Sequence, residues 1–127
     1  MGMPEKIRVL VVDDDEQIVE MVKILLAQAG CDTQIAYNAK KGMELAMAQQ
    51  FDLIVLDINL PDGNGIELCR ELKQRHLSYR TPIIFMSGRH HEEDILRGQA
   101  VGAVDYILKP FKVDDFIQRI LVHTRAT

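Results

Sequence analysis

The sequence predicts an α/β fold in which helices cover a parallel five-stranded sheet. Five short apolar runs alternate with longer segments of helical periodicity along the chain. This alternation is typical of βαβ units, whose strands lie parallel in one sheet. The length of 127 residues suits one domain, which buries about two thirds of its unfolded surface and needs no disulfide or structural metal. We therefore expect residues 1–127 to form a single domain.

The expected strands are the five apolar runs, which lie at residues 7–12, 32–36, 53–56, 83–86 and 104–108. The first helix is expected from Glu16 to Ala29, because apolar residues recur there at helical spacing and Gly30 follows as a stop signal. The last helix is expected from Val113, where apolar residues form one stripe. Weaker periodicity indicates three further helices at residues 39–49, 65–75 and 92–101, and Asn38 can cap the first of these.

The composition argues against several classes of function. A formal net charge of -4 and a pI near 5.5 disfavour binding of a polyanion by this segment, because nucleic-acid-binding domains usually carry a basic face. No apolar run approaches the roughly 20 residues of a membrane span, and Met1–Lys6 is too short and polar for a signal peptide. A cytoplasmic location is therefore expected. Cys31 and Cys69 lack the spacing of a metal site or disulfide framework, so we expect inert structural thiols.

Polar side chains follow four of the five expected strands. Asp13 and Asp14 follow the first, Asp57 the third, Ser87 the fourth and Lys109 the fifth. Because right-handed crossovers bring the carboxyl ends of parallel strands to one edge of the sheet, we expect these side chains to converge on one site. That site would hold three carboxylates, a hydroxyl and an ammonium group.

Each of these residues also has a purely structural interpretation. The run Asp13-Asp14-Asp15 is typical of a helix N-cap with acids in the first helical turn, and Asp15 is expected to be such a first-turn acid. Asp57 and Ser87 alone would be caps, and Lys109 alone a solvated charge. Structural caps do not, however, require acids on two adjacent strands together with a hydroxyl and a lysine on the next two. The combination therefore favours a functional site.

The expected carboxylate cluster favours a divalent cation. Two carboxylates about 5 Å apart repel each other by about 3 kcal/mol at an effective dielectric of about 20, so the cluster should raise its pKa values or bind a cation. Oxygen ligands beside an exposed loop suit Mg²⁺. The loop at residues 60–65 follows Asp57 closely and can bring the carbonyl of Asn59 toward that cation.

A cation held by carboxylates indicates phosphate chemistry. Asp57 is the best candidate nucleophile, because it ends a central strand and a carboxylate can attack a phosphoryl group. Lys109 and the metal would neutralise the transferring oxygens. The sequence has no phosphate-binding glycine motif of nucleotide-binding proteins. The four histidines do not form a catalytic set, and His90 and His91 are expected to be exposed.

Four segments in order resemble the receiver domain of two-component response regulators. They are Val11-Val12-Asp13-Asp14-Asp15, Leu56-Asp57-Ile58-Asn59-Leu60-Pro61, Phe85-Met86-Ser87-Gly88 and Leu108-Lys109-Pro110-Phe111. The resemblance covers essentially the whole chain and implies a flavodoxin-like, doubly wound (βα)5 fold with strand order 2-1-3-4-5.

The resemblance also implies a role for each site residue. Asp57 would be the phosphoacceptor, and Mg²⁺, or alternatively Mn²⁺, would bind Asp57, Asp14 and the Asn59 carbonyl, with Asp13 acting through water. Lys109 would bind the phosphoryl group. Ser87 would be the switch hydroxyl, and the Lys109–Pro110 peptide would be cis.

Tyr106 matches the aromatic switch position of the family, and the alternative is a strand aromatic half buried against the last helix. Val104 stands where relatives that are transcription factors often have an acid, so their charged dimer network is incomplete here, although Asp115 and Arg119 match it. A homodimer through the surface formed by the fourth helix, fifth strand and fifth helix remains open. Gly88 replaces a common alanine after the switch hydroxyl and can loosen that loop.

The expected function is that of a signalling phosphoacceptor rather than an enzyme. Its partners would be a sensor histidine kinase or phosphotransfer protein and a downstream effector. One alternative is a metal-dependent phosphohydrolase with an aspartyl-phosphate intermediate, and another is a degenerate receiver used for docking or dimerisation. Met1-Gly2-Met3 is interpreted as an expression remnant within a disordered start at residues 1–5. Arg125-Ala126-Thr127 resembles an arbitrary end, so either an excised domain or a complete regulator is expected.

Overall fold

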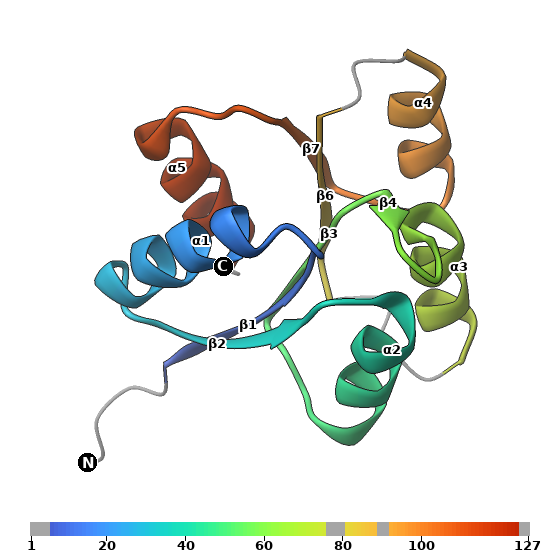
Figure 1. Ribbon diagram of the computed structural model, residues 1–127, viewed down its shortest axis with the longest axis horizontal. Helices are drawn as coiled ribbons and strands as arrows, with labels where there is room; N and C mark the ends of the chain where they lie inside the picture. The colour runs from blue at the N-terminus through green and yellow to red at the C-terminus, as the bar shows by residue number, and fades with distance from the viewer. Residues whose placement is uncertain (1–5, 76–80, 89–91, 125–127) are drawn as a thin grey trace.

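The computed structural model describes residues 6–75, 81–88 and 92–124. Helices and strands follow one another in the predicted order, with an additional pair of short strands, β4 and β5, after β3 (Figure 1). The elements are β1 (Ile7–Val12), α1 (Glu16–Gln28), β2 (Cys31–Ala36), α2 (Ala39–Ala48), β3 (Leu53–Leu56), β4 (Asn59–Leu60), β5 (Gly63–Asn64), α3 (Gly65–Arg75), β6 (Ile83–Ser87), α4 (Glu92–Ala100), β7 (Asp105–Leu108) and α5 (Val113–Thr124). The expectations for Met1–Met3, residues 1–5, His90, His91 and Arg125–Thr127 lie outside the described residues.

The main sheet is parallel and its strand order is β2-β1-β3-β6-β7. This confirms the predicted order 2-1-3-4-5, because β4 and β5 belong to a separate antiparallel hairpin. The hairpin occupies the segment that the sequence predicted only as a loop. The sheet is therefore the predicted flavodoxin-like, doubly wound sheet.

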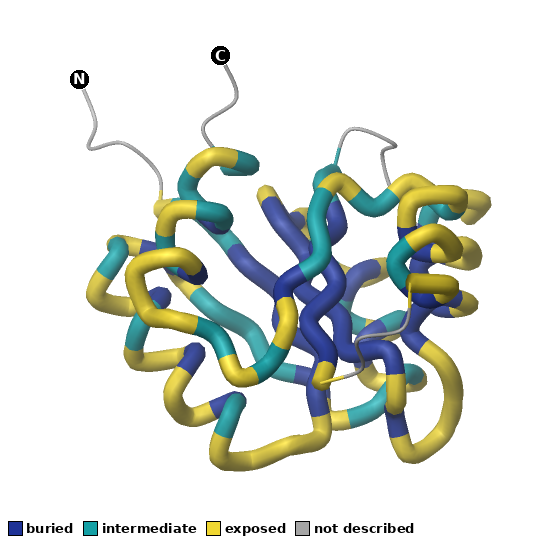
Figure 2. Tube along the Cα trace, turned by 90° about the horizontal axis from the view of Figure 1, so that it is seen from above, coloured by how far each residue is buried: buried dark blue, intermediate teal, exposed yellow. Residues whose placement is uncertain are grey.

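Helices cover both faces of the sheet, α1 and α5 on one side and α2, α3 and α4 on the other (Figure 1). Successive β1 residues therefore enter different cores, with Val9 and Val11 packing on the side of Phe116 and Ile120, while Leu10 packs on the opposite side. Because both faces are covered, the central strands are almost continuously apolar. Figure 2 shows these strands buried and the outer faces of the helices exposed.

The helix ends agree closely with the sequence, with one correction. Asn38 caps α2 as expected, since its side chain accepts a hydrogen bond from the Lys41 backbone N–H. Asp15 is the N-cap of α1 rather than an acid within its first turn, because its carboxylate accepts hydrogen bonds from the backbone N–H groups of Gln17 and Ile18. The carboxylate of Asp15 is thus engaged with the helix end.

Two further sequence expectations can be compared with the described residues. Cys31 and Cys69 are buried free thiols, and burial raises the pKa of Cys69 to about 11, as expected for structural cysteines. None of the described helices has the length and apolar character needed to cross a membrane.

Candidate functional site

The register of the sheet brings the polar strand ends together at one edge. Val12 pairs with Leu56 at the ends of the adjacent strands β1 and β3. Asp13 and Asp57, which follow them, therefore lie next to each other at the carboxyl end of the sheet. The Asp57 N–H donates to the Val12 carbonyl at 2.8 Å, and the Lys109 N–H donates to the Ser87 carbonyl at 2.9 Å. Backbone pairing thus holds the predicted site residues before any side-chain contact is made.

Lys109 joins the two buried carboxylates. Its Nζ lies 2.6 Å from Asp13 Oδ2 and 3.4 Å from Asp57 Oδ2. The other Asp13 oxygen, Oδ1, accepts a hydrogen bond from the Asp15 N–H at 2.9 Å. Asp13 is fully buried and Asp57 is 7% exposed, whereas Asp14 is exposed. The site therefore has a buried floor and one carboxylate at its open rim.

The surroundings of Asp57 disfavour the charged form of its carboxylate. Burial is the main reason that its pKa is raised to about 6, and the negative charge of Asp13 adds to the shift, while Lys109 opposes it. For Lys109, burial alone would lower the pKa, but its hydrogen bond with Asp13 and the two nearby carboxylates raise it overall. One ammonium group thus does not fully compensate the carboxylates around it.

The same carboxylates fit a hard divalent cation. Asp13, Asp14 and Asp57 each offer an oxygen, and these oxygens lie within 4.8 Å of one another. Oxygen-only donors at an exposed rim suit Mg²⁺, which retains several waters. A cation would also relieve the electrostatic cost that raises the pKa of Asp57. The predicted three-carboxylate cluster is therefore present, although its occupation by a metal is a proposal.

The hairpin after Asp57 places Asn59 next to this cluster in the chain. Asn59 begins β4 and pairs with Asn64 in β5. At the base of the hairpin, the Gly65 N–H donates to the Ile58 carbonyl at 2.7 Å. A Cβ atom on Gly65 would lie 2.0 Å from the Asp57 carbonyl oxygen. Only glycine allows this close approach of α3 to the end of β3.

Ser87 and Tyr106 lie on neighbouring strands. Ser87 is the last residue of β6, is 1% exposed and pairs with Leu108, whereas Tyr106 pairs with Phe85 two residues earlier on each strand. The two predicted switch residues therefore lie close in the sheet. The Lys109–Pro110 peptide is cis, as the family resemblance implied.

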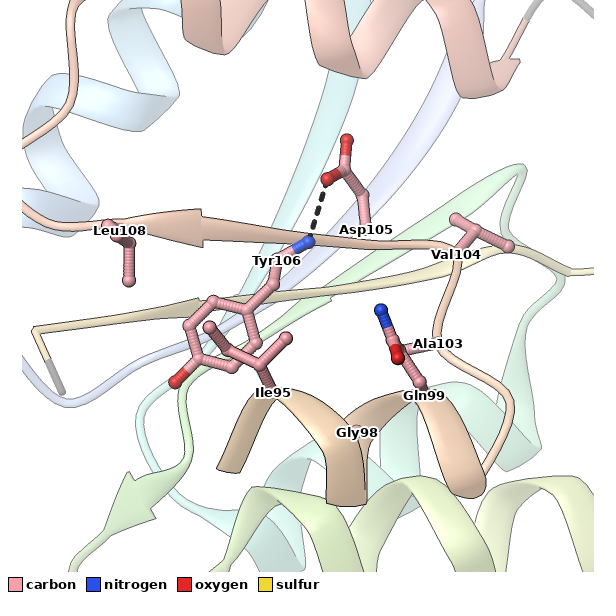
Figure 3. A pocket seen from close by; sticks show the side chains of 8 residues that line it. All are labelled: Ile95, Gly98, Gln99, Ala103, Val104, Asp105, Tyr106 and Leu108. Atoms are coloured by element: carbon pink, nitrogen blue, oxygen red, sulfur yellow. Dashed lines mark hydrogen bonds between the residues drawn. The ribbon is translucent and has the colours of Figure 1, made fainter. Parts of the chain in front are cut away.

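The Tyr106 side chain lies on the α4 side of the sheet. Its ring centroid is 6.3 Å from that of Phe85, and it packs on the core cluster that contains Phe85. The alternative expectation, packing against the last helix, is wrong, since α5 covers the opposite face. Figure 3 shows Tyr106 beside Ile95 in a pocket between α4 and β7. This pocket has a volume of about 320 Å³.

A second charged network connects β7 with α5. Asp105 accepts a hydrogen bond from Arg119 Nη1 at 2.6 Å and lies 3.1 Å from His123 Nε2. Arg119 also pairs with Asp115 through its Nε at 3.0 Å. The sequence indicated Asp115 and Arg119 for a charged network, but His123 was not predicted to join it. The spacing of four residues between Arg119 and His123 was the available signal, because such residues share a helix face.

Comparison with known proteins identifies the family to which this fold and carboxylate cluster belong. Residues 9–121 match the family model described as response regulator receiver domain. The chain therefore belongs to that family and is a signalling module of the two-component type. The phosphohydrolase alternative receives no support from any of these comparisons.

Named relatives agree with this assignment. The chain is 35% identical to the response regulator ArlR of Staphylococcus saprophyticus, over 89% of this chain and 50% of the relative. It is 36% identical to the transcriptional regulatory protein DltR of Streptococcus agalactiae, over 94% of this chain and 53% of the relative. It thus spans about half the length of these curated relatives.

Solved structures show the same architecture. The non-phosphorylated HemR receiver domain from Leptospira biflexa has a TM-score of 0.88 at 33% identity, with 96% of this chain and 97% of that chain covered. A CheY-like receiver domain protein from Methanospirillum hungatei has a TM-score of 0.88 at 30% identity, with 94% of each chain covered.

Proposed function

We propose that residues 1–127 form one receiver unit in which Asp57 accepts a phosphoryl group from a phosphohistidine. The partner would be a sensor histidine kinase or a histidine phosphotransfer protein. An Asp57 carboxylate oxygen attacks phosphorus, the bond between phosphorus and the imidazole nitrogen breaks, and the imidazole leaves with the electron pair. The observation that carries the proposal is the buried Asp57 carboxylate beside both the Lys109 ammonium group and the other two carboxylates.

Several residues of the chain would contribute to this transfer, each in a different way. Asp13, Asp14, Asp57 and the carbonyl of Asn59 would hold Mg²⁺ or Mn²⁺, with Asp13 acting through water, and the bound ion supplies charge neutralisation for the phosphoryl oxygens. Lys109 would supply a second positive charge, and its ion pair with Asp13 keeps that carboxylate oriented. The domain in this way assists its own phosphorylation and dephosphorylation, as a phosphoacceptor rather than an enzyme acting on a separate substrate.

Uptake of phosphate by the parent chain tests this function directly. Incubation with acetyl phosphate and Mg²⁺ should add the mass of one phosphoryl group, as intact-mass measurement can show, and EDTA should prevent the addition. An equal gain of mass in the presence of EDTA would contradict the metal requirement. No gain under either condition would contradict the proposed function itself.

Asp14 and Asp15 are expected to contribute differently to metal binding. Asp14→Ala should abolish saturable Mg²⁺ binding, because Asp14 is the exposed carboxylate of the cluster. Asp15→Ala should change the affinity little and cost about 1 kcal/mol of stability, because the Asp15 side chain caps α1. Calorimetric titration and urea unfolding measure the two effects. Equal losses of affinity would mean that the acidic triplet has been misassigned.

The output of phosphorylation is proposed to run through Ser87 and Tyr106 to the α4–β7–α5 face. Phosphoryl oxygens can draw the Ser87 hydroxyl inward and leave space for Tyr106 to follow. Ser87→Ala should then take up phosphate but lose the backbone amide NMR shifts in α4 and β7 on addition of beryllofluoride, a phosphoryl mimic. Shifts as large as those of the parent chain would contradict this route.

The α4–β7–α5 face also indicates which partners the domain would bind. Leu96, Val104 and Val122 are exposed apolar side chains on or next to α4, β7 and α5. We propose that this face binds a downstream effector domain or protein, or a second copy of the chain as a homodimer. Because the donor kinase needs ATP, the proposed setting is the cytoplasm.

A further inference from the structure

Asp62 makes an unusual connection between the β4–β5 hairpin and α2. It lies in the turn of the hairpin, and its two carboxylate oxygens accept hydrogen bonds from the backbone N–H groups of Ala39 at 2.7 Å and Lys40 at 3.0 Å. These donors are the first residues of α2. The hydrogen bonds lower the pKa of Asp62, so its carboxylate remains charged near neutral pH.

The capping of α2 is thus shared between two segments. Asn38 accepts from the Lys41 N–H through its side chain and from the Gly42 N–H through its carbonyl. Asp62 satisfies the two N–H groups that come before these. The first N–H groups of a helix have no partner within the helix, and the side chains of Asn38 and Asp62 together satisfy those of Ala39, Lys40 and Lys41. Asn38 caps α2 locally, whereas Asp62 ties it to the hairpin.

Helix α2 is itself held firmly against the strand that leads to Asp13. A Cβ atom on Gly42 would lie 2.9 Å from Val12 Cγ2, so α2 packs closely on the last residue of β1. The Asp13 N–H also donates to the carbonyl of Ala36, at the end of β2, at 3.0 Å. The start of α2 therefore has a defined position relative to the segment that carries Asp13 and Asp14.

The hairpin has a second, separate attachment at its base. There the Gly65 N–H donates to the Ile58 carbonyl, directly after Asp57. Asn59 then pairs with Asn64 in the separate two-stranded sheet of β4 and β5. Without Asp62, the base would remain attached while the turn would lose its two hydrogen bonds to α2. The position of Asn59, between base and turn, depends on both attachments.

From these contacts we infer that Asp62 is a positioning residue for the candidate metal centre. It fixes the hairpin, and with it the Asn59 carbonyl, relative to the β1 side of the site, which carries Asp13 and Asp14. Asp62 does not bind the metal or the phosphoryl group in this scheme. The inference rests on the proposed function, because that function makes the Asn59 carbonyl a metal ligand.

Three variants separate positioning from simple helix capping. Asp62→Ala removes both hydrogen bonds to α2 and should weaken Mg²⁺ binding about threefold to tenfold, somewhat less than the 10–100-fold loss typical when a direct partner of a ligand is removed. Asp62→Asn retains one acceptor oxygen and should recover part of the affinity. Asn38→Ala is the matched control, because it loses a cap at the same helix end without touching the hairpin, and its affinity should equal that of the parent chain.

Titration of Mg²⁺ into the unphosphorylated domain gives the affinities. Amide hydrogen exchange, measured without metal, shows how stably the hairpin is held in place. Exchange at Leu60 and Gly63 should accelerate in Asp62→Ala and remain at the parent rate in Asn38→Ala. Parent-like affinity in Asp62→Ala, or an equal loss in Asn38→Ala, would overturn the inference. If the parent chain bound no Mg²⁺, the proposed metal site would fail, and unchanged hairpin exchange in Asp62→Ala would separately refute the positioning role.

Discussion

Asp57→Asn is expected to take up no phosphoryl group from acetyl phosphate under conditions in which the parent chain is fully labelled. The amide of asparagine is not a nucleophile of this kind. Asp13 also contacts Lys109 and belongs to the carboxylate cluster, but it is fully buried and its two oxygens already accept hydrogen bonds from the Asp15 N–H and from Lys109. Intact-mass measurement gives the result. Asp32→Asn is a suitable control, because Asp32 lies at the opposite edge of the sheet, where its exposed carboxylate is 3.9 Å from Arg8 Nε. Labelling of Asp57→Asn as complete as that of the parent would refute the assignment of Asp57.

The same variant should be more stable than the parent chain above pH 6 in the absence of divalent cations. The pKa of Asp57 is about 6 in the folded chain and about 3.9 when unfolded. The folded state therefore binds more protons than the unfolded state between these values, so the free energy of unfolding falls as the pH rises through this window. The difference between these two pKa values corresponds to about 3 kcal/mol, which is an upper limit because Lys109 loses one of its two partners in the variant.

Urea unfolding with EDTA present can measure this difference. Asp57→Asn should gain about 2 kcal/mol over the parent at pH 7.5, and this difference should shrink as the pH falls through 6 and level off only below about pH 4, where the parent carboxyl becomes protonated in both states. A variant less stable than the parent at pH 7.5 would mean that the Lys109 contact outweighs the cost of burying the charge. Mg²⁺ should stabilise the parent chain by an amount that rises with the logarithm of the Mg²⁺ concentration once this exceeds Kd.

Gly65→Ala is expected to be the most damaging of the conservative substitutions near the site. The new Cβ atom would lie 2.0 Å from the Asp57 carbonyl oxygen, and since this oxygen belongs to the backbone, α3 or the end of β3 must move. We expect a loss of about 3 kcal/mol in the free energy of unfolding, at the upper end of the range for overpacking. Movement at Asp57 should also lower the rate of phosphoryl uptake.

Gly63→Ala provides a control in the same hairpin. There a Cβ atom would meet only the Ala39 Cβ at 3.7 Å, an ordinary contact. Its stability should stay within about 0.5 kcal/mol of the parent, as for most surface substitutions. Urea unfolding of both variants compares them directly. Similar stabilities would show that the chain accommodates the Gly65 methyl by a small local shift, contrary to the prediction.

Much of the fold and of the candidate site was predictable because local and periodic patterns encode it. The apolar runs at residues 7–12, 53–56 and 83–86 are continuous, as expected for strands covered on both faces. In a parallel sheet, strand direction alone brings the polar residues after such runs to one edge. The convergence of Asp13, Asp57 and Lys109 followed from that rule without knowledge of any side-chain contact.

Other features depended on packing between segments far apart in the sequence. Nothing in the sequence indicated that Lys109 would lie closer to Asp13 than to Asp57, because that difference is set by how β1, β3 and β7 pack. The face occupied by Tyr106 was left open for a similar reason. A single aromatic in a strand that is covered on both sides has no polar face to orient it, and its register with Phe85 determines its place.

The sequence by itself thus determined the order of the elements, the parallel sheet and the set of residues at its functional edge, because these depend on periodicity and chain direction. Only the tertiary structure decided the β4–β5 hairpin, the hydrogen bonds of Asp62 to α2 and the pairing of Asp105 with Arg119 and His123. The contacts of Asp62 and Asp105 join residues at least 14 positions apart in the sequence, whereas the hairpin pairs residues within 59–64. Their partners are selected by distance in the folded chain, which local sequence patterns do not encode.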